Sequence, residues 1–111
     1  MREFASQPYS KLYNAPVTPF EAGSFDIDYD RYEEFLRYYL DNDTFVEHGG
    51  LIVNPEAAEV FYMDDEEYER TTELALDIIG DTVPAFAGVF GLRRETVVER
   101  AELVAELGAD G

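Results

Sequence analysis

The 111-residue sequence contains no cysteine, few basic residues and no long apolar run. Without cysteine, a disulfide framework, a zinc site made of thiolates and a thiol nucleophile are all excluded. Only 8 lysine and arginine residues stand against 25 aspartate and glutamate residues, and Lys11 is the only lysine. Nucleic acid is therefore not expected as a partner, because neutralising phosphates requires clustered positive charge.

The sequence also has no apolar stretch of about 18 residues, the length that a membrane-spanning helix needs. Its start, Met1 to Phe4, does not show the apolar core of a signal peptide. We therefore expect a soluble, cytoplasmic protein that does not bind membranes.

The formal net charge of −17 arises from acidic residues spread along the chain rather than gathered in a tail. At molar salt, the repulsion between such charges is screened to a range of about 3 Å. A high negative charge with a single lysine therefore indicates a whole-surface adaptation to a salty cytoplasm. We expect a halophilic source, and an ordinary acidic protein is the alternative.

The hydrophobic pattern of the first half predicts a strand, a helix and a second strand. Residues 13–20 include two prolines and are expected to form a first strand with its exit loop. Apolar residues at helical spacing then predict an amphipathic helix that ends in the polar turn 41–44. The apolar run 51–53 predicts a short strand that is buried on both faces.

The second half predicts a helix, a strand and another helix. Asp64 or Asp65 can cap a helix that ends near Gly80, and residues 82–89 read as a third strand. A third helix is expected at about 93–107, followed by Gly108. The predicted buried stripes are Tyr68, Thr71, Ala75, Ile78 and Ile79 in one helix and Val97, Ala101, Val104 and Ala105 in the other.

Strands and helices that alternate in this way form a parallel sheet with right-handed crossovers. Residues 109–111 look like the approach to a further strand. A three-stranded parallel sheet leaves edges and apolar faces uncovered, so we predict that part of the chain is missing. A compact α/β domain of three units is the alternative.

Several short motifs occur in the order and at the spacing of one known family. Residues 15–20, followed by Gly23 and Asp26, resemble the opening of the dihydrodipicolinate synthase and N-acetylneuraminate lyase family. Residues 50–53 lie where that family enters its Gly-Thr-Thr-Gly-Glu motif, and residues 83–89 resemble its third strand. The family's next pattern, a Glu, a Leu and Glu-Glu-x-x-Arg, is matched at Glu59, Met63, Glu66, Glu67 and Arg70.

The resemblance implies an α/β fold, a TIM (β/α)8 barrel of which only the first three βα units are present. Residues 1–111 would be the N-terminal part of a single barrel domain, truncated before the fourth strand. In this family a lysine on the sixth strand forms a Schiff base with pyruvate or another 2-oxo acid, and a tyrosine after the fifth strand relays protons. Both residues would lie beyond Gly111, and Lys11 is expected to be an ordinary surface lysine.

The complete protein is accordingly expected to be a class I aldolase-type lyase, acting as an aldolase, a synthase or a dehydratase. The resemblance implies a 2-oxo acid as substrate, a homo-oligomer as assembly, and neither a cofactor nor a metal. The 111-residue chain by itself is expected to be inactive. A non-catalytic barrel kept for binding or assembly, and a merely truncated chain without activity, remain the alternatives.

The sequence departs from the family at the motif after the second strand. Glu56 and Ala57 occupy the positions of the two threonines, of which one relays protons and the other holds the substrate carboxylate. We predict Glu56 and Ala57 as substrate-binding residues. Glu56 has two open interpretations: a general acid or base whose pKa is raised by burial, or a loop or helix-cap contact. Glu59 is expected to be structural.

Two further features have structural explanations. The acidic run 64–67 matches a helix N-terminus better than a calcium loop, so a metal is not expected. His48, the only histidine, precedes a predicted strand and is expected at the surface, away from the chemistry.

Overall fold

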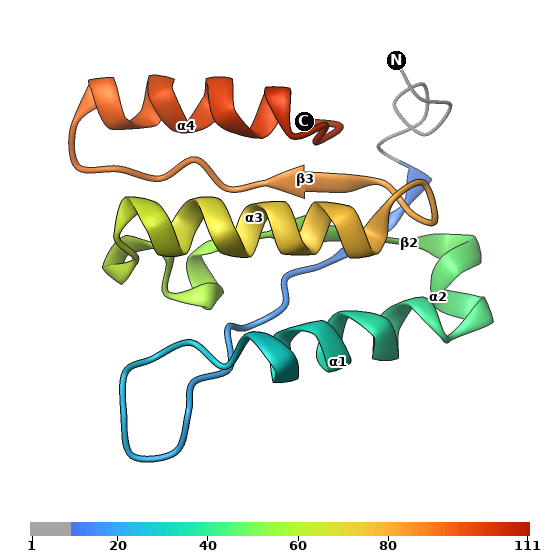
Figure 1. Ribbon diagram of the computed structural model, residues 1–111. Coiled ribbons are helices and arrows are strands. Elements are labelled where there is room, and N and C mark those ends of the chain that lie inside the picture. Colours follow the sequence, from blue (N-terminus) through green and yellow to red (C-terminus); the bar gives the residue numbers. More distant parts are fainter. Residues whose placement is uncertain (1–9) are drawn as a thin grey trace.

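The computed structural model describes residues 10–111 and shows a parallel sheet with helices packed on one face (Figure 1). The strands are β1 (Leu12–Asn14), β2 (Gly49–Val53) and β3 (Ala85–Ala87), and they lie side by side in the order β1-β2-β3. Both pairings are parallel, as the alternating pattern predicts. The expectation drawn from Met1 to Phe4 concerns residues outside this range.

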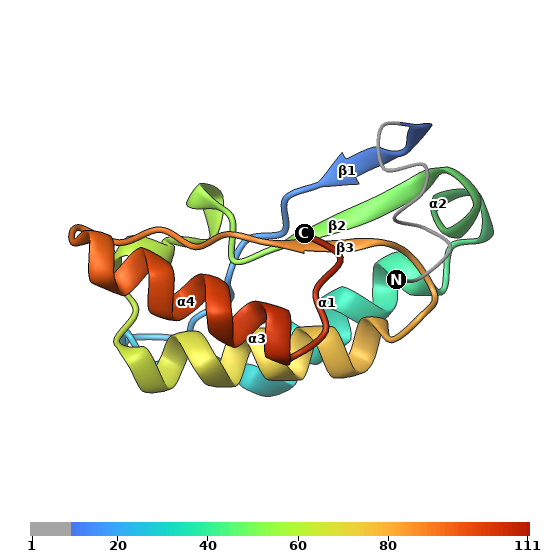
Figure 2. The same cartoon turned by 90° about the horizontal axis from the view of Figure 1, so that it is seen from above.

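Helices α1 (Tyr29–Leu40), α3 (Asp65–Ile79) and α4 (Arg94–Glu106) all lie on the same side of the sheet (Figure 2). Leu36, Leu51, Val53 and Ile79 are fully buried between the sheet and the helices. Their burial removes apolar surface from water and provides the main stabilising contribution to this core.

The start of α1 is fixed by Asp28, whose side chain accepts a hydrogen bond from the backbone N–H of Arg31 at 3.0 Å. The helix then continues to the residue that the sequence predicts, Leu40. The chain turns at Asp41 and Asn42, as predicted, but Asp43 and Thr44, which were expected to belong to the same turn, begin a further helix. Asn42 caps a short helix, α2 (Asp43–His48), which the ring of Phe45 anchors on Tyr39 at 5.1 Å between ring centroids.

Between β2 and α3 the chain makes two short 3-10 turns, η3 (Glu56–Ala58) and η4 (Val60–Tyr62). Helix α3 then begins with a capping box. Asp64 accepts from the N–H of Glu67 at 2.8 Å, and Glu67 accepts from the N–H of Asp64 at 3.1 Å. Asp64, one of the two predicted caps, is therefore the N-cap.

The buried face of α4 differs from the predicted face. Ala101 and Ala105 are exposed, whereas Arg100 and Val104 are buried. The prediction assumed that the small apolar residues face inward. An alanine methyl gains little from burial, while Arg100 reaches several partners under the helix, so the helix presents Arg100 to the interior.

After α4, Gly108 adopts a positive φ of 92° and turns the chain back along β3. The N–H of Asp110 donates to the carbonyl of Ala85 at 2.8 Å, and the N–H of Ala87 donates to Gly111 at 2.9 Å. These last residues therefore lie beside β3 where the fourth strand is predicted to begin.

The second face of the sheet has no covering helix within residues 10–111 (Figure 2). On this face the ring of Tyr13 crosses β2 above Gly50 and stacks on Phe86, with 4.8 Å between ring centroids. A Cβ at Gly50 would lie 2.5 Å from the Tyr13 ring, so glycine makes this crossing possible. Ile52 lies on the same face and is half-buried, whereas the other four residues of β2 are buried, so the expected burial of β2 on both faces holds except at Ile52.

None of the helices between residues 10 and 111 combines the length and the apolar character needed to cross a membrane.

Candidate functional site

The carboxyl ends of the three parallel strands meet at one edge of the sheet, on the left in Figure 1. Binding and catalytic residues of parallel α/β folds gather at this edge, on the loops that follow the strands. Here the loops comprise residues 15–28, 54–63 and 88–93, which lead into α1, α3 and α4. The edge is therefore the candidate site.

Asn54 fixes the exit of β2. It is fully buried, and its backbone has a φ of 48°, a left-handed conformation that asparagine tolerates better than most residues. Its side-chain amide donates to the hydroxyls of Thr71 and Thr72, each at 2.9 Å. The loop that leads to Glu56 is thereby attached to the middle of α3.

Gly88 holds the chain that leaves β3 next to the chain that leaves β2. Its N–H donates to the carbonyl of Val53 at 2.8 Å, and a Cβ would lie only 2.2 Å from the carbonyl oxygen of Asn54. Its own carbonyl accepts from the hydroxyl of Tyr68 at 2.6 Å. Burial raises the pKa of Tyr68, so the phenol remains protonated and continues to donate at neutral pH.

Glu56 and Ala57 lie at the candidate edge, in η3, and both side chains are exposed. Pro55 before them is buried and holds the start of the turn. The Glu56 carboxylate makes no hydrogen bond to any residue between 10 and 111, and the cap bond of this turn comes from the N–H of Glu59 to the carbonyl of Glu56 at 3.0 Å. Within residues 10–111, therefore, neither the burial expected for a general acid nor a cap or loop contact of the carboxylate is found at Glu56.

Glu59 lies between the two 3-10 turns and has a left-handed φ of 61°. Its N–H and its carbonyl take part in the two turns, which joins η3 to η4 through the backbone. The expected structural role of Glu59 is therefore found in its backbone conformation, and its side chain is exposed.

The single lysine and the single histidine lie at the opposite edge of the sheet. Lys11 precedes β1 and donates to the carbonyl of Glu47 at 2.7 Å. His48 closes α2, immediately before β2, and its side chain is 62% exposed. Both therefore occupy the surface positions that the sequence predicts, away from Glu56.

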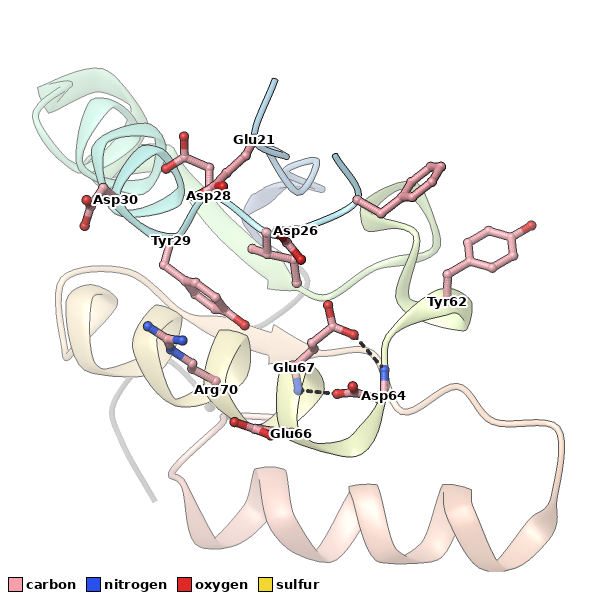
Figure 3. Close-up of a pocket in the computed structure, with 12 residues that line it drawn as sticks. Glu21, Asp26, Asp28, Tyr29, Asp30, Tyr62, Asp64, Glu66, Glu67 and Arg70 are labelled. Carbon is pink, nitrogen blue, oxygen red and sulfur yellow. Dashed lines mark hydrogen bonds between the residues drawn. The ribbon is translucent and has the colours of Figure 1, made fainter. Parts of the chain in front are cut away.

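An acidic groove lies between the loop before α1 and the start of α3 (Figure 3). Two of its acids cap helices, Asp28 for α1 and Asp64 for α3, and no cluster within residues 10–111 is arranged to hold a metal ion. Arg70 lines the groove, and its guanidinium carbon lies 3.7 Å from the centroid of the Tyr29 ring. The groove-lining carboxylates are Glu21, Asp26, Asp28, Asp30, Asp64, Glu66 and Glu67.

This groove is a poor place for an anionic substrate, because its carboxylates outnumber its one arginine. Neither Glu56 nor Ala57 lines it. The groove is thus formed at the candidate edge, partly by residues of loops 15–28 and 54–63, but it does not include Glu56 or Ala57.

The sequence prediction missed four residues that organise this edge: Asn54, Tyr68 in its hydrogen-bonding role, Gly88 and Arg100. A weak signal was present for two of them. Asn54 interrupts an apolar run directly before a proline, and Arg100 stands between Val97 and Val104 on an otherwise apolar helix face.

Comparison with known proteins finds relatives that share one name. No family model matches the chain. The chain is 34% identical over 108 residues to the 4-hydroxy-tetrahydrodipicolinate synthase of Kineococcus radiotolerans, covering 95% of this chain and 32% of that protein. It is 32% identical over 97 residues to the enzyme of the same name from Thermotoga neapolitana, covering 87% of this chain and 31% of the relative. The chain thus spans about a third of the length of these relatives.

Solved structures show the same fold. Dihydrodipicolinate synthase from Aquifex aeolicus superposes with a TM-score of 0.80 at 24% identity, covering 93% of this chain and 33% of that structure. CdNal from Clostridium difficile, solved in complex with mannosamine, gives a TM-score of 0.82 at 23% identity, covering 93% of this chain and 34% of its own. The shared sequence and the shared arrangement of strands and helices agree with the motif order, and the chain belongs to the dihydrodipicolinate synthase and N-acetylneuraminate lyase family.

Proposed function

We propose that residues 1–111 are the N-terminal part of a single (β/α)8-barrel domain, holding its first three βα units. The chain covers about a third of each relative, and three of eight strands is a similar share. The backbone hydrogen bonds between residues 110–111 and β3, one donated by Asp110 and one accepted by Gly111, support a fourth strand that begins there. The sheet face bearing Tyr13, Ile52 and Phe86 would then become the interior of the barrel.

We further propose that the complete protein is a Schiff-base lyase acting on pyruvate or another 2-oxo acid. The amine of a lysine adds to the 2-oxo carbonyl and water leaves, which gives a protonated imine. When a neighbouring C–H or C–C bond breaks, the imine accepts the electron pair. Lys11 lies at the opposite edge of the sheet from Glu56, so the reactive lysine would come from a later strand.

The observation that supports a distinct substrate is the replacement of both motif threonines at this edge. Ala57 has no hydroxyl and would contribute only its backbone N–H to a substrate carboxylate. A charged Glu56 beside that carboxylate would repel it, whereas a protonated Glu56 would donate a hydrogen bond. This favours 2-keto-3-deoxy sugar acids, from which a general acid at Glu56 would help to expel water.

The test uses the protein expressed from its complete gene. Borohydride reduction in the presence of pyruvate should attach the 2-oxo acid covalently, and mass spectrometry should locate it on one lysine. In a turnover assay with a panel of sugar acids, Glu56→Gln should lower kcat by at least about tenfold, as expected for a lost general acid. The matched control, Glu59→Gln, changes an exposed carboxylate in the same loop and should retain activity.

Two results would overturn parts of this proposal. An imine with pyruvate but no turnover of any sugar acid would reject the substrate class. Equal activity of Glu56→Gln and wild type would reject the catalytic interpretation of Glu56 and leave the loop contact.

A second candidate function is a non-catalytic barrel that serves binding or assembly. The exposed, hydroxyl-free turn at Glu56 and Ala57 favours it, because the family's proton relay is absent there. A sixth strand without lysine would establish this alternative. We propose a homo-oligomer in either case, which analytical ultracentrifugation would reveal.

A further inference from the structure

Arg100 is the buried cation of the described chain. Arg100 is buried, with 8% of its surface accessible, whereas every other arginine between residues 10 and 111 is exposed. Burying a charge is costly unless hydrogen bonds and nearby charges compensate for the lost water. A buried arginine on a surface helix therefore needs a reason, and its contacts supply one.

Its guanidinium joins segments that are far apart in the sequence. Nη1 donates to the carbonyl of Phe90 at 2.7 Å, and Nη2 approaches the carbonyl of Met63 at 3.5 Å. The flat group also stacks on the ring of Tyr68, with 4.2 Å from the guanidinium carbon to the ring centroid. The exposed carboxylate of Asp65 lies 3.6 Å away on the outer side and supplies the opposite charge.

These partners belong to the two loops that form the candidate edge. Met63 is the last residue of the loop that begins at Asn54, and Phe90 belongs to the loop that follows β3. The ring under the guanidinium is that of Tyr68, whose hydroxyl holds the carbonyl of Gly88 in the second loop. One arginine and one tyrosine therefore connect the loop after β2 to the loop after β3.

We propose that Arg100 is a positioning residue: it holds loop 54–63 against loop 88–93 and so sets where Glu56 and Ala57 meet the substrate. This inference rests on the proposed function for its consequence in catalysis. The contacts themselves do not depend on it. Because Ala57 would hold the substrate and Glu56 would act as the general acid, loss of Arg100 should raise KM and lower kcat together.

An arginine is required for this arrangement. Its planar fork can bond two carbonyls while it stacks on an aromatic ring, whereas a lysine ammonium is a single point that reaches one carbonyl and does not stack in the same way. Arg100→Lys should therefore restore part of the function that Arg100→Met loses. A role limited to filling space would instead be served equally well by methionine.

The experiment uses the protein expressed from its complete gene and compares Arg100→Met, Arg100→Lys and the control Arg94→Met. Arg94 is an exposed arginine on the same helix. In Arg100→Met, amide hydrogen exchange should accelerate by about tenfold or more in both loops, 54–63 and 88–93, and remain unchanged in β2. KM for the 2-oxo acid should rise and kcat should fall, each by at least about threefold. Arg100→Lys should give exchange rates and kinetic constants between those of Arg100→Met and wild type, and Arg94→Met should match wild type in both.

The two readouts separate the two proposals. If the wild type neither forms an imine nor turns over a substrate, the proposed function fails, and hydrogen exchange still decides whether Arg100 couples the loops. Unchanged exchange in either loop would overturn the coupling. Faster exchange in both loops with an unchanged KM and an unchanged kcat would overturn the role in positioning Glu56 and Ala57. Should Arg100→Met not fold, Arg100→Lys provides both readouts, and wild-type values for that variant would contradict the requirement for arginine.

Discussion

Replacing Asn54 by alanine should destabilise the protein through two separate effects. The side-chain amide donates two hydrogen bonds to the hydroxyls of Thr71 and Thr72, within a fully buried site. The backbone at Asn54 has a φ of 48°, which alanine adopts only at a cost. The site thus combines side-chain bonding with a backbone conformation that few residues favour.

The magnitudes can be estimated for each effect. Two hydrogen bonds contribute about 1 kcal/mol each to the free energy of unfolding. A left-handed conformation costs alanine about 1–2 kcal/mol. Asn54→Ala should therefore lower the free energy of unfolding by about 3–4 kcal/mol.

Glycine at the same position separates the two effects. Asn54→Gly loses the same hydrogen bonds but has no penalty at positive φ, while the greater freedom of its unfolded chain costs about 0.4–1 kcal/mol. Since the left-handed penalty is larger, the glycine variant should be about 0.5–1 kcal/mol more stable than the alanine variant. Urea denaturation, followed by circular dichroism with a shared m-value, measures both differences.

Asn54→Asp provides the third comparison. The hydroxyl protons of Thr71 and Thr72 are already donated to the carbonyls of Glu67 and Tyr68, so a buried carboxylate would find no donor there. This variant should be the least stable of the three at neutral pH. An alanine variant as stable as the glycine variant, or an aspartate variant as stable as wild type, would refute the reasoning.

Four further predictions concern other parts of the molecule. Tyr32→Phe should stabilise the protein by about 1 kcal/mol, because the Tyr32 hydroxyl is buried without a hydrogen-bond partner among residues 10–111. Burial also raises the pKa of Tyr32 above its ordinary value of 10.0. The free energy of unfolding of wild type should therefore fall as the pH rises beyond that value, and that of Tyr32→Phe should fall less. Equal falls in the two proteins would contradict this. Leu36→Ala, in the core, should cost about 2–5 kcal/mol in urea denaturation, against less than about 0.5 kcal/mol for the exposed Val98→Ala. Asp64→Ala should cost about 1 kcal/mol by removing the helix cap, while Asp64→Ser should retain most of it. With a net charge of −17, the melting temperature should rise between about 0.1 M and 1 M KCl, and a constant value would count against a high-salt adaptation.

The sequence predicted those parts of the fold that depend on local patterns. The three strands, the long helices and the cap at Asp64 follow from apolar spacing and from residues with strong positional preferences. Helix α2 was missed because its stability comes from the Asn42 cap and the contact between Tyr39 and Phe45, which a run of polar residues does not reveal.

The candidate site was predicted less completely because the positions of its loops depend on contacts between distant segments. The position of Glu56 and Ala57 after β2 followed from the motif alignment, and the structure places them at the expected edge. The roles of Gly88 and Arg100 arise only when α3, α4 and two loops come together, over 20 and 37 residues of sequence separation. The apolar neighbours of Arg100 on its helix face indicate that it could be buried, but no local pattern identifies the partners of Gly88 or Arg100.

We propose that the complete protein is a Schiff-base lyase, that this chain supplies one edge of its site and that the reactive lysine lies in another part of the protein. Mass spectrometry of the protein expressed from its complete gene, after borohydride reduction with pyruvate, tests this most directly. We expect a single adduct on a lysine other than Lys11, and Lys11→Arg should not change its amount. An adduct confined to Lys11, or no adduct with any 2-oxo acid, would contradict it.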